Sequence, residues 1–210
     1  MLIPKNVLEL YLGNSLPNIA YIYGRWLFNN FELIESLLPK DGKILDIGCG
    51  FGLLSNYAAL KSAKREVIGV DLSRKRINVA KSSVNGRNNV MFKVEDVKNL
   101  TSVKFDAMIM TDFLHHINYD EQNKIIKYAY KNLKVGGTLI IKDVDKRRGI
   151  VFFFHANIDK YLWNFGGDIF FFPSKNLEKR LNGVGFKVRR VDNWNRAFSC
   201  ESLFVCEKAL

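Results

Sequence analysis

The chain has 210 residues, of which 48% are hydrophobic, and this is enough for one domain with a buried core. Its formal net charge of +11 would suit an anionic partner such as a nucleic acid. However, lysine and arginine are spread along most of the sequence, so a basic solvated surface is the simpler explanation.

The sequence also suggests where the protein is found. No apolar run reaches the roughly 20 residues of a membrane-spanning helix, and the first residues lack the basic-then-apolar pattern of a signal peptide. The three cysteines give no disulfide framework, and no histidine accompanies Cys200 and Cys206 as a metal ligand. We therefore expect a cytoplasmic protein with reduced cysteines and no metal.

Residues 1 to about 40 are predicted to be helical. An apolar stripe with three- and four-residue steps predicts one helix that packs on a core, through Leu27, Phe31, Ile34 and Leu38. Pro39 and a turn at residues 41–42 end it. Upstream lies an aromatic cluster with one arginine: Tyr11, Tyr21, Tyr23, Arg25 and Trp26. This cluster either packs into the core or forms a flap over a substrate pocket.

A glycine-rich turn follows the first predicted strand. Residues 44–47 are apolar except for Asp46, glycines follow at positions 48, 50 and 52, and residues 53–60 have the apolar spacing of a helix. An α/β fold uses a strand, a glycine turn and a helix to bring its backbone against a ligand. Glycine permits positive φ and lets backbone N–H groups face that ligand.

Strands and helices then alternate. We predict strands at residues 66–71, 90–94, 105–112 and 138–143. Ser73 is the expected cap of one intervening helix, and the turn at 85–86 suits a left-handed helix end. Another helix runs from about 120 to 133 and is closed by the glycines at 136–137. This alternation predicts a parallel sheet with right-handed crossovers.

The last third of the chain departs from this rhythm. Residues 146–173 are rich in phenylalanine, tryptophan and tyrosine, interrupted by polar residues. Ser174 is the predicted cap of a helix that buries Leu177 and Leu181. Two strands, 186–191 and 202–206, should then pair as an antiparallel hairpin. The predicted fold is thus a doubly wound α/β sheet of seven mostly parallel strands with an antiparallel C-terminal strand and helices on both faces.

Carboxylates mark three successive strand ends: Asp46 within the first strand, Asp71 after the second and Asp96 after the third. Ligands of open α/β sheets bind at the carboxyl ends of strands, so these acids should converge. Asp71 lies about 20 residues beyond the glycines, where such folds hold two ribose hydroxyls. The glycine spacing is G-x-G-x-G, which differs from the dinucleotide motif, and Asp46 suits a positively charged end of a ligand.

These motifs resemble those of the class I S-adenosylmethionine-dependent methyltransferases. The resemblance is carried by residues 46–52, 67–73, 94–97, 105–117 and 133–141, in the order in which that family has them. It implies a Rossmann-like fold, S-adenosyl-L-methionine as the methyl donor and S-adenosyl-L-homocysteine as its product. It also divides a single domain into a helical cap (1–40), a cofactor-binding core (41–145), an aromatic lid insert (146–173) and a C-terminal helix with its hairpin (174–210).

The resemblance further implies roles for individual residues. Asp46 would face the ammonium group of the methionine moiety, Asp71 would bind both ribose hydroxyls, and Asp96 would accept from the adenine amino group. The alternatives are a helix cap for Asp71 and a turn residue for Asp96. The whole implied cofactor set is Asp46, Gly48, Cys49, Gly50, Gly52, Asp71, Leu72, Asp96, Val97, Thr111 and Asp112.

Methyl transfer from a sulfonium is an in-line displacement, so the protein mainly positions the acceptor and excludes water. Some acceptors also need a general base, for which His116 and then His115 are the candidates after the fourth strand. Alternatively, one histidine packs under the loop and the other contacts the cofactor. Asp112 is a further candidate base, and Asp143 and Asp145, also at a strand end, are further candidates for contact with the acceptor.

The aromatic segments predict a small, apolar or aromatic acceptor. The candidate contacts are Tyr23, Arg25, Phe153 and Trp163. Two other functions stay open: an RNA or protein methyltransferase that uses the basic surface, and a non-catalytic cofactor-binding protein. The sequence leaves undetermined the acceptor, the atom methylated, the pathway and the oligomeric state.

Overall fold

The computed structural model describes residues 2–100, 103–146, 152, 168–191 and 200–209. These fall into two compact units, Met1–Ile109 and Met110–Leu210, and each is described by itself. None of the helices in the described ranges combines the length and hydrophobicity that crossing a bilayer demands. Within the same ranges, no group of three His, Cys, Asp or Glu side chains is arranged to hold a metal ion.

The strands form a seven-stranded sheet in the order β3-β2-β1-β4-β5-β7-β6. Their bounds are β1 Gly42–Ile47, β2 Arg65–Asp71, β3 Val90–Val94, β4 Phe105–Thr111, β5 Leu133–Val144, β6 Phe186–Val191 and β7 Glu201–Lys208. Strand β2 pairs in parallel with β1 and β3, whereas β7 pairs antiparallel with β5 and β6. The predicted mostly parallel sheet, its antiparallel C-terminal strand and the closing hairpin are confirmed.

The first unit carries most of the helices. These are α1 Lys5–Leu8, η1 Glu9–Tyr11, α2 Leu16–Phe28, α3 Phe31–Ser36, α4 Leu53–Lys61, α5 Arg74–Ser82 and the short η2 Val97–Asn99. Helix α4 packs on β2 and β3, as does α5. The Ser73 side chain accepts a hydrogen bond from Arg76 N, so the predicted cap of α5 is confirmed. Asn85 and Gly86 are both left-handed, but they lie beyond the end of α5.

The prediction of one helix through Leu27 and Leu38 is wrong. Asn29 has extended backbone, and Asn30 then caps α3 by accepting a hydrogen bond from Leu33 N at 3.3 Å. As a result Leu27 belongs to α2 and is 47% exposed, while Phe31 belongs to α3 and is buried. Two asparagines that compete for backbone hydrogen bonds break a stripe whose apolar spacing is otherwise continuous.

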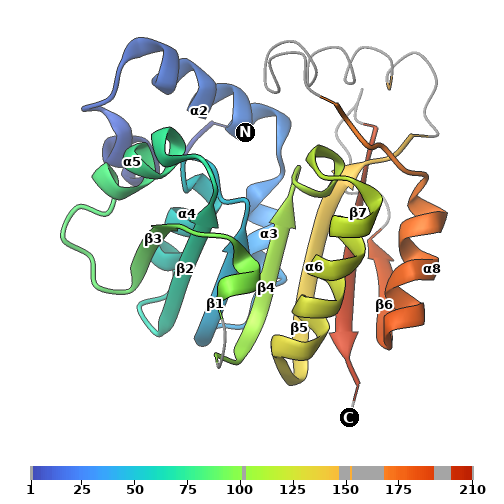
Figure 1. Cartoon of the computed structure of the whole chain (residues 1–210). Coiled ribbons are helices and arrows are strands. Elements are labelled where there is room, and N and C mark those ends of the chain that lie inside the picture. Colours follow the sequence, from blue (N-terminus) through green and yellow to red (C-terminus); the bar gives the residue numbers. More distant parts are fainter. Residues whose placement is uncertain (1, 101–102, 147–151, 153–167, 192–199, 210) are drawn as a thin grey trace. The chain divides into compact units, whose positions relative to one another are not determined.

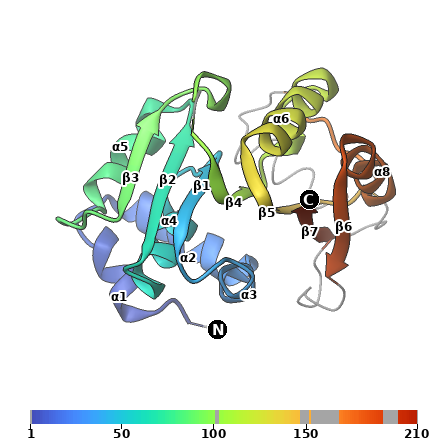
Figure 2. The ribbon, with the colours of Figure 1, turned by 90° about the horizontal axis from the view of Figure 1, so that it is seen from below.

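The second unit contains η3 Leu114–His116, α6 Tyr119–Asn132 and α8 Ser174–Val184. Figures 1 and 2 show α6 and α8 side by side, and they contact β5, β6 and β7. Leu177 and Leu181 of α8 are buried, as predicted. These helices cover the end of the sheet that holds the antiparallel strand.

The predicted extent of α6, about 120 to 133, is confirmed, but its predicted closure by glycine and the predicted cap of α8 are wrong. Helix α6 ends at Asn132 because Leu133 is already extended (ψ 144°), so Gly136, with φ 74°, lies inside β5 rather than closing the helix. In α8, Pro173 occupies the N-cap position without a side-chain capping hydrogen bond, and Ser174 is the first residue of the helix. The Ser174 backbone N–H donates to Asp145 Oδ1 at 3.1 Å, so a distant carboxylate satisfies it.

Candidate functional site

The glycine turn after β1 has a left-handed backbone at alternate positions. Gly48, Gly50 and Gly52 have φ of 72°, 55° and 77°, which L-residues rarely adopt. A Cβ atom at Gly52 would lie 2.5 Å from the Phe92 ring, so packing also requires glycine there. At Gly50, by contrast, no atom of the described residues lies within 4 Å of such a Cβ. The backbone is therefore open to a ligand at Gly50.

Hydrogen bonds hold this turn against the end of β2. The backbone N–H groups of Gly48 and Cys49 donate to Val70 O at 2.8 and 3.0 Å, and Gly50 N–H donates to Asp71 Oδ2 at 3.0 Å. Asp71 also accepts from Ser73 N–H at 2.8 Å. The Asp71 carboxylate thus lies against the glycine turn, as the sequence predicts, and helix α5 takes its cap from Ser73 instead.

Asp46 is buried beneath the turn, with 1% of its surface exposed. Its Oδ2 accepts from Ser55 Oγ at 2.5 Å, whereas no hydrogen-bond donor of the described residues reaches its buried Oδ1. Burial raises the pKa of Asp46 to about 6, against the opposing effects of the Ser55 hydrogen bond and the Arg25 charge. A buried carboxylate oxygen without a donor favours a cationic ligand group.

The other predicted cofactor contacts of the first unit lie just after the ends of β2 and β3. Leu72 is largely exposed after β2, and Val97 is buried. Asp96 caps η2, with Oδ1 accepting from Lys98 N–H at 2.9 Å, which is the turn role considered above. Its role toward adenine stays a prediction.

The second unit places a buried ion cluster at the end of β4. Thr111 is buried, and Asp112 follows it with φ 50°. Asp112 Oδ1 lies 2.5 Å from Nζ of the fully buried Lys142, which also pairs with Glu201. The one sign of this cluster in the sequence is that Lys142 follows three apolar residues of a predicted strand rather than lying in a loop.

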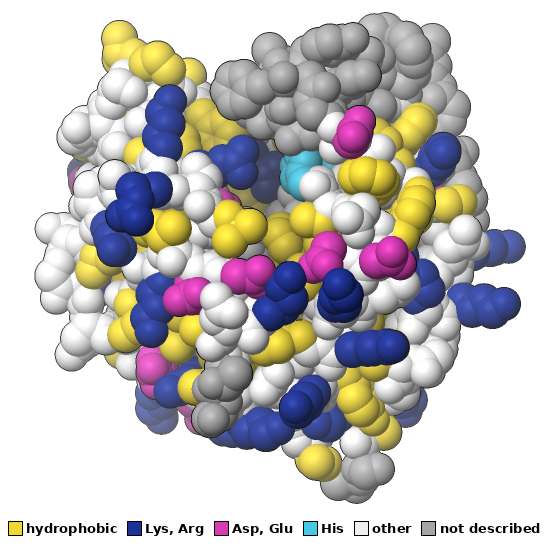
Figure 3. All heavy atoms as spheres, viewed as in Figure 1, with side chains coloured by type: hydrophobic (Ala, Val, Ile, Leu, Met, Phe, Trp, Pro, Cys, Tyr) yellow, Lys and Arg dark blue, Asp and Glu magenta, His cyan; other side chains and the backbone are white. Residues whose placement is uncertain are grey.

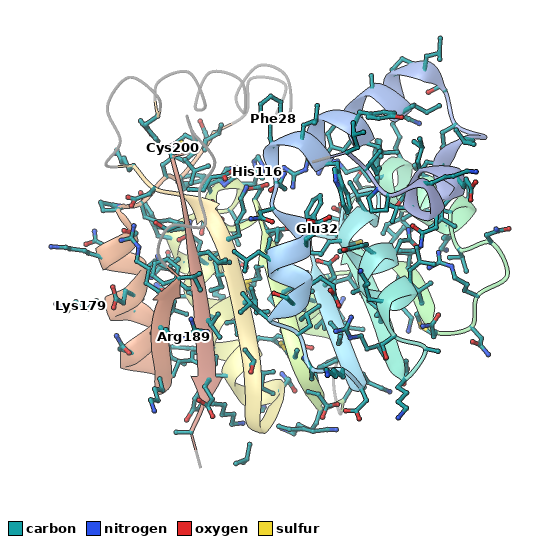
Figure 4. The ribbon with its side chains drawn as sticks, turned by 180° about the vertical axis from the view of Figure 1, so that it is seen from behind. Phe28, Glu32, His116, Lys179, Arg189 and Cys200 are labelled. Atoms are coloured by element: carbon teal, nitrogen blue, oxygen red, sulfur yellow. The ribbon has the colours of Figure 1, made fainter. Side chains whose placement is uncertain are left out.

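The two adjacent histidines have different surroundings. His115 is fully buried, and its Nδ1 is 2.5 Å from Asp143 Oδ1. Asp143 Oδ2 in turn accepts from Leu114 N–H at 2.9 Å. His116, labelled in Figure 4, is only half-buried, with its ring centroid 4.0 Å from that of His115. Asp143 thus positions His115, while His116 is the more accessible of the two.

The four predicted acceptor contacts are only partly described. Tyr23 on α2 is 38% exposed, and Arg25 is half-buried with its charge acting on Asp46. Phe153 and Trp163 lie outside the described residues. Of the remaining N-terminal aromatics, Tyr11 and Trp26 are buried, which agrees with the packing interpretation for those two.

Basic side chains do not gather into one patch on the face shown in Figure 3, where lysines and arginines are scattered among acidic, apolar and neutral groups. Lys179 on α8 and Arg189 on β6 are examples of exposed basic residues, both labelled in Figure 4. The dispersed charge is consistent with a basic solvated surface.

Comparisons with known proteins agree with this geometry. Residues 44–137 match the family model described as a methyltransferase domain. A phosphoethanolamine N-methyltransferase of Plasmodium falciparum is 32% identical over 108 residues, covering 50% of this chain and 40% of that protein. A ubiquinone biosynthesis O-methyltransferase of Coxiella burnetii is 32% identical over 119 residues, covering 55% and 49%. The chain thus spans about half the length, or less, of these curated relatives.

Solved structures share the fold of this chain. The magnesium protoporphyrin IX methyltransferase of Synechocystis, solved with bound S-adenosylhomocysteine, superposes with a TM-score of 0.71 over 97% of this chain and 93% of that one. At 19% identity this likeness shows the fold alone. Residues 44–137 therefore match a methyltransferase domain, and the chain has the fold of a structure solved as a methyltransferase.

Proposed function

We propose that this protein transfers a methyl group from S-adenosylmethionine to a small-molecule acceptor. The observation that carries the proposal is the buried Oδ1 of Asp46, which no donor of the described residues reaches. It lies next to a glycine turn whose backbone is open at Gly50. An ammonium group at Asp46 would supply the missing donor and stabilise the charged carboxylate.

The remaining contacts fit the rest of the same ligand. The two oxygens of Asp71 now accept from backbone N–H groups of Gly50 and Ser73, and a ribose diol is the ligand group that a carboxylate at this strand end holds. Val97 and Leu72 would offer apolar contact to adenine, and Asp96 would accept from its amino group. Thr111 and Asp112, in the second unit, stay predicted cofactor contacts from the sequence.

S-adenosylmethionine, when bound, supplies an electrophilic methyl group whose leaving group is a neutral thioether. The side chains of this chain would align the acceptor atom, exclude water and, for an acceptor that carries a proton, receive that proton. His116 is the proposed base because it is the less buried histidine. His115, which is held by Asp143, would keep the adjacent His116 ring in position.

We propose a small apolar or aromatic acceptor. Tyr23, Leu27 and Phe28 present exposed apolar surface on α2, and Phe28 lies at its C-terminal end in Figure 4. Tyr23 and Arg25 remain the proposed contacts in this segment, together with Phe153 and Trp163. The relatives described above are named for small molecules, which supports a small-molecule acceptor but not its apolar or aromatic character.

Calorimetry with S-adenosylmethionine and S-adenosylhomocysteine tests the cofactor half of the proposal. We expect both to bind the wild type, and Asp71→Ala to bind at least about tenfold more weakly, because a carboxylate hydrogen bond is worth about 1.5–3 kcal/mol. Lys179→Ala on the exposed face of α8 is the matched control and should bind as the wild type does. Absence of binding to the wild type, or equal binding by Asp71→Ala, would sink the proposal.

A screen of cell extract with methyl-labelled donor tests the acceptor half. Label in small metabolites is the expected result. Label in protein or RNA would instead support a macromolecular acceptor, whose binding should weaken steeply with salt if phosphates are contacted. Cofactor binding without any labelled product would support the non-catalytic alternative.

A further inference from the structure

The N-terminal segment is hydrogen-bonded to the glycine turn through one buried phenol. Tyr11 in η1 is fully buried, and its O–H donates to the carbonyl oxygen of Phe51 at 3.0 Å. Phe51 lies between Gly50 and Gly52, two residues with left-handed backbone. Burial raises the pKa of Tyr11, so the phenol keeps the proton that this hydrogen bond requires.

A second set of hydrogen bonds fixes the phenol from behind. Asn56 in α4 donates through Nδ2 to Tyr11 Oη at 2.7 Å and to Ser83 Oγ at 2.7 Å. The Oδ1 of the same amide accepts from Arg87 Nη2 at 2.5 Å. Both ends of the Asn56 side chain are therefore occupied, which holds the Tyr11 hydroxyl in one orientation.

The Phe51 carbonyl completes the anchoring of the turn. Gly48, Cys49 and Gly50 are held by β2 through their N–H groups. Gly52 N–H donates to Cys49 O within the turn. The peptide between Phe51 and Gly52 receives its hydrogen bond from Tyr11, and the Tyr21 ring packs on the Phe51 ring at a centroid distance of 4.6 Å. The N-terminal segment thus supplies the contacts to this side of the turn.

We infer that Tyr11 is a positioning residue for the cofactor: its hydroxyl holds the glycine turn in the conformation that binds S-adenosylmethionine. This inference rests on the proposed function. Glycine loses more backbone freedom on ordering than any other residue, so a glycine turn that is already ordered binds more tightly than one ordered by its ligand. By linkage, cofactor binding must also stabilise the segment that carries Tyr11.

The test is calorimetry with S-adenosylhomocysteine on Tyr11→Phe, which removes the hydroxyl and keeps the ring. Loss of one hydrogen bond that organises the turn should weaken binding by about three- to tenfold. Ser83→Ala is the matched control, because it also removes a buried hydroxyl from the Asn56 network but leaves the Phe51 carbonyl paired. It should lower thermal stability and leave the affinity unchanged.

Amide hydrogen exchange gives a second readout. Exchange at Gly52 should become faster in Tyr11→Phe and not in Ser83→Ala, and in the wild type S-adenosylhomocysteine should slow exchange in residues 5–11. Unchanged affinity in Tyr11→Phe, or equal weakening in both variants, would overturn the inference. If the wild type bound no S-adenosylhomocysteine, the proposed function would fail, and unchanged Gly52 exchange in Tyr11→Phe would separately refute the role of Tyr11.

Discussion

His115 Nδ1 and Asp143 Oδ1 lie 2.5 Å apart in a buried position, and the ring of the neighbouring His116 contacts that of His115 at a tilt of 48°. The two histidines therefore differ: Asp143 holds His115 in a buried, structural position, whereas His116 is accessible. With the acceptor found by the labelled-donor screen, we expect His116→Ala to lower kcat by about 10²- to 10⁴-fold if His116 is the base.

The affinity for S-adenosylhomocysteine should not change in His116→Ala, and calorimetry provides that control. Asp143→Asn should instead lower the free energy of unfolding by about 1–3 kcal/mol, because it weakens a buried, charge-assisted hydrogen bond. An unaltered kcat in His116→Ala would assign the proton transfer to another group or to none.

Asp46 should make stability depend on pH in an unusual direction. Its pKa rises from 3.8 to about 6 on folding, so between these values the folded state binds the extra proton. Stability from this group is therefore present at low pH and lost as pH rises through about 6, by about 3 kcal/mol in total. In urea unfolding, the free energy of unfolding of Asp46→Asn, relative to that of the wild type, should therefore increase by about 3 kcal/mol between pH 4 and pH 7.

The same carboxylate should have the opposite effect on the proposed ligand. Because an ammonium group needs the charged form, S-adenosylhomocysteine should bind the wild type more weakly as pH falls below about 6. Asp46→Asn should bind weakly at every pH. A wild-type affinity that is constant from pH 5 to 7.5 would contradict the proposed contact.

Gly50 and Gly86 allow backbone strain to be separated from ligand contact. Both have positive φ, and neither has an atom of the described residues within 4 Å of an added Cβ. Gly50→Ala and Gly86→Ala should therefore each cost about 1 kcal/mol of stability. Only Gly50→Ala should also weaken S-adenosylhomocysteine binding, by about tenfold, because its methyl group would cover the open backbone of the turn. If Gly50→Ala and Gly86→Ala bound S-adenosylhomocysteine with equal affinity, the ligand would not approach Gly50.

Lys142 should be essential for the stability of the second unit. Lys142→Met removes the buried cation that Asp112 and Glu201 share, which should cost about 3–5 kcal/mol in urea unfolding. Adding Glu201→Gln should restore part of that loss, since it removes one of the two carboxylates. If Lys142→Met alone were as stable as the wild type, the cluster would not be held together by charge.

The sequence predicted those parts of the fold that depend on local pattern. The short apolar runs around Val67 and Val90 are bounded by turns and became strands at their predicted positions. The predictions failed where a side chain formed a hydrogen bond with a backbone group far away in the sequence, or competed for backbone hydrogen bonds nearby. Asn30 broke the N-terminal stripe, and Asp145 satisfied Ser174 from 29 residues away.

The candidate site shows the same division. Asp46 and Asp71 could be found from the sequence, because each lies at a characteristic spacing from the same three glycines. The hydrogen bond from Tyr11 to Phe51 spans 40 residues, and the pair of Lys142 with Glu201 spans 59. No pattern in a single sequence joins such residues, since only the folded backbone brings them together.

Strand β5 has a further property that follows from the alternation of its side chains. Lys142 points toward Asp112 and Glu201, while the next residue, Asp143, points to the other face and His115. Sliding β5 along β7 by one residue would exchange the two, bringing Asp143 against two carboxylates and Lys142 against an imidazole. The opposite charges of two adjacent residues therefore specify the register of the antiparallel pair, and a misaligned sheet is excluded by electrostatics as well as by packing.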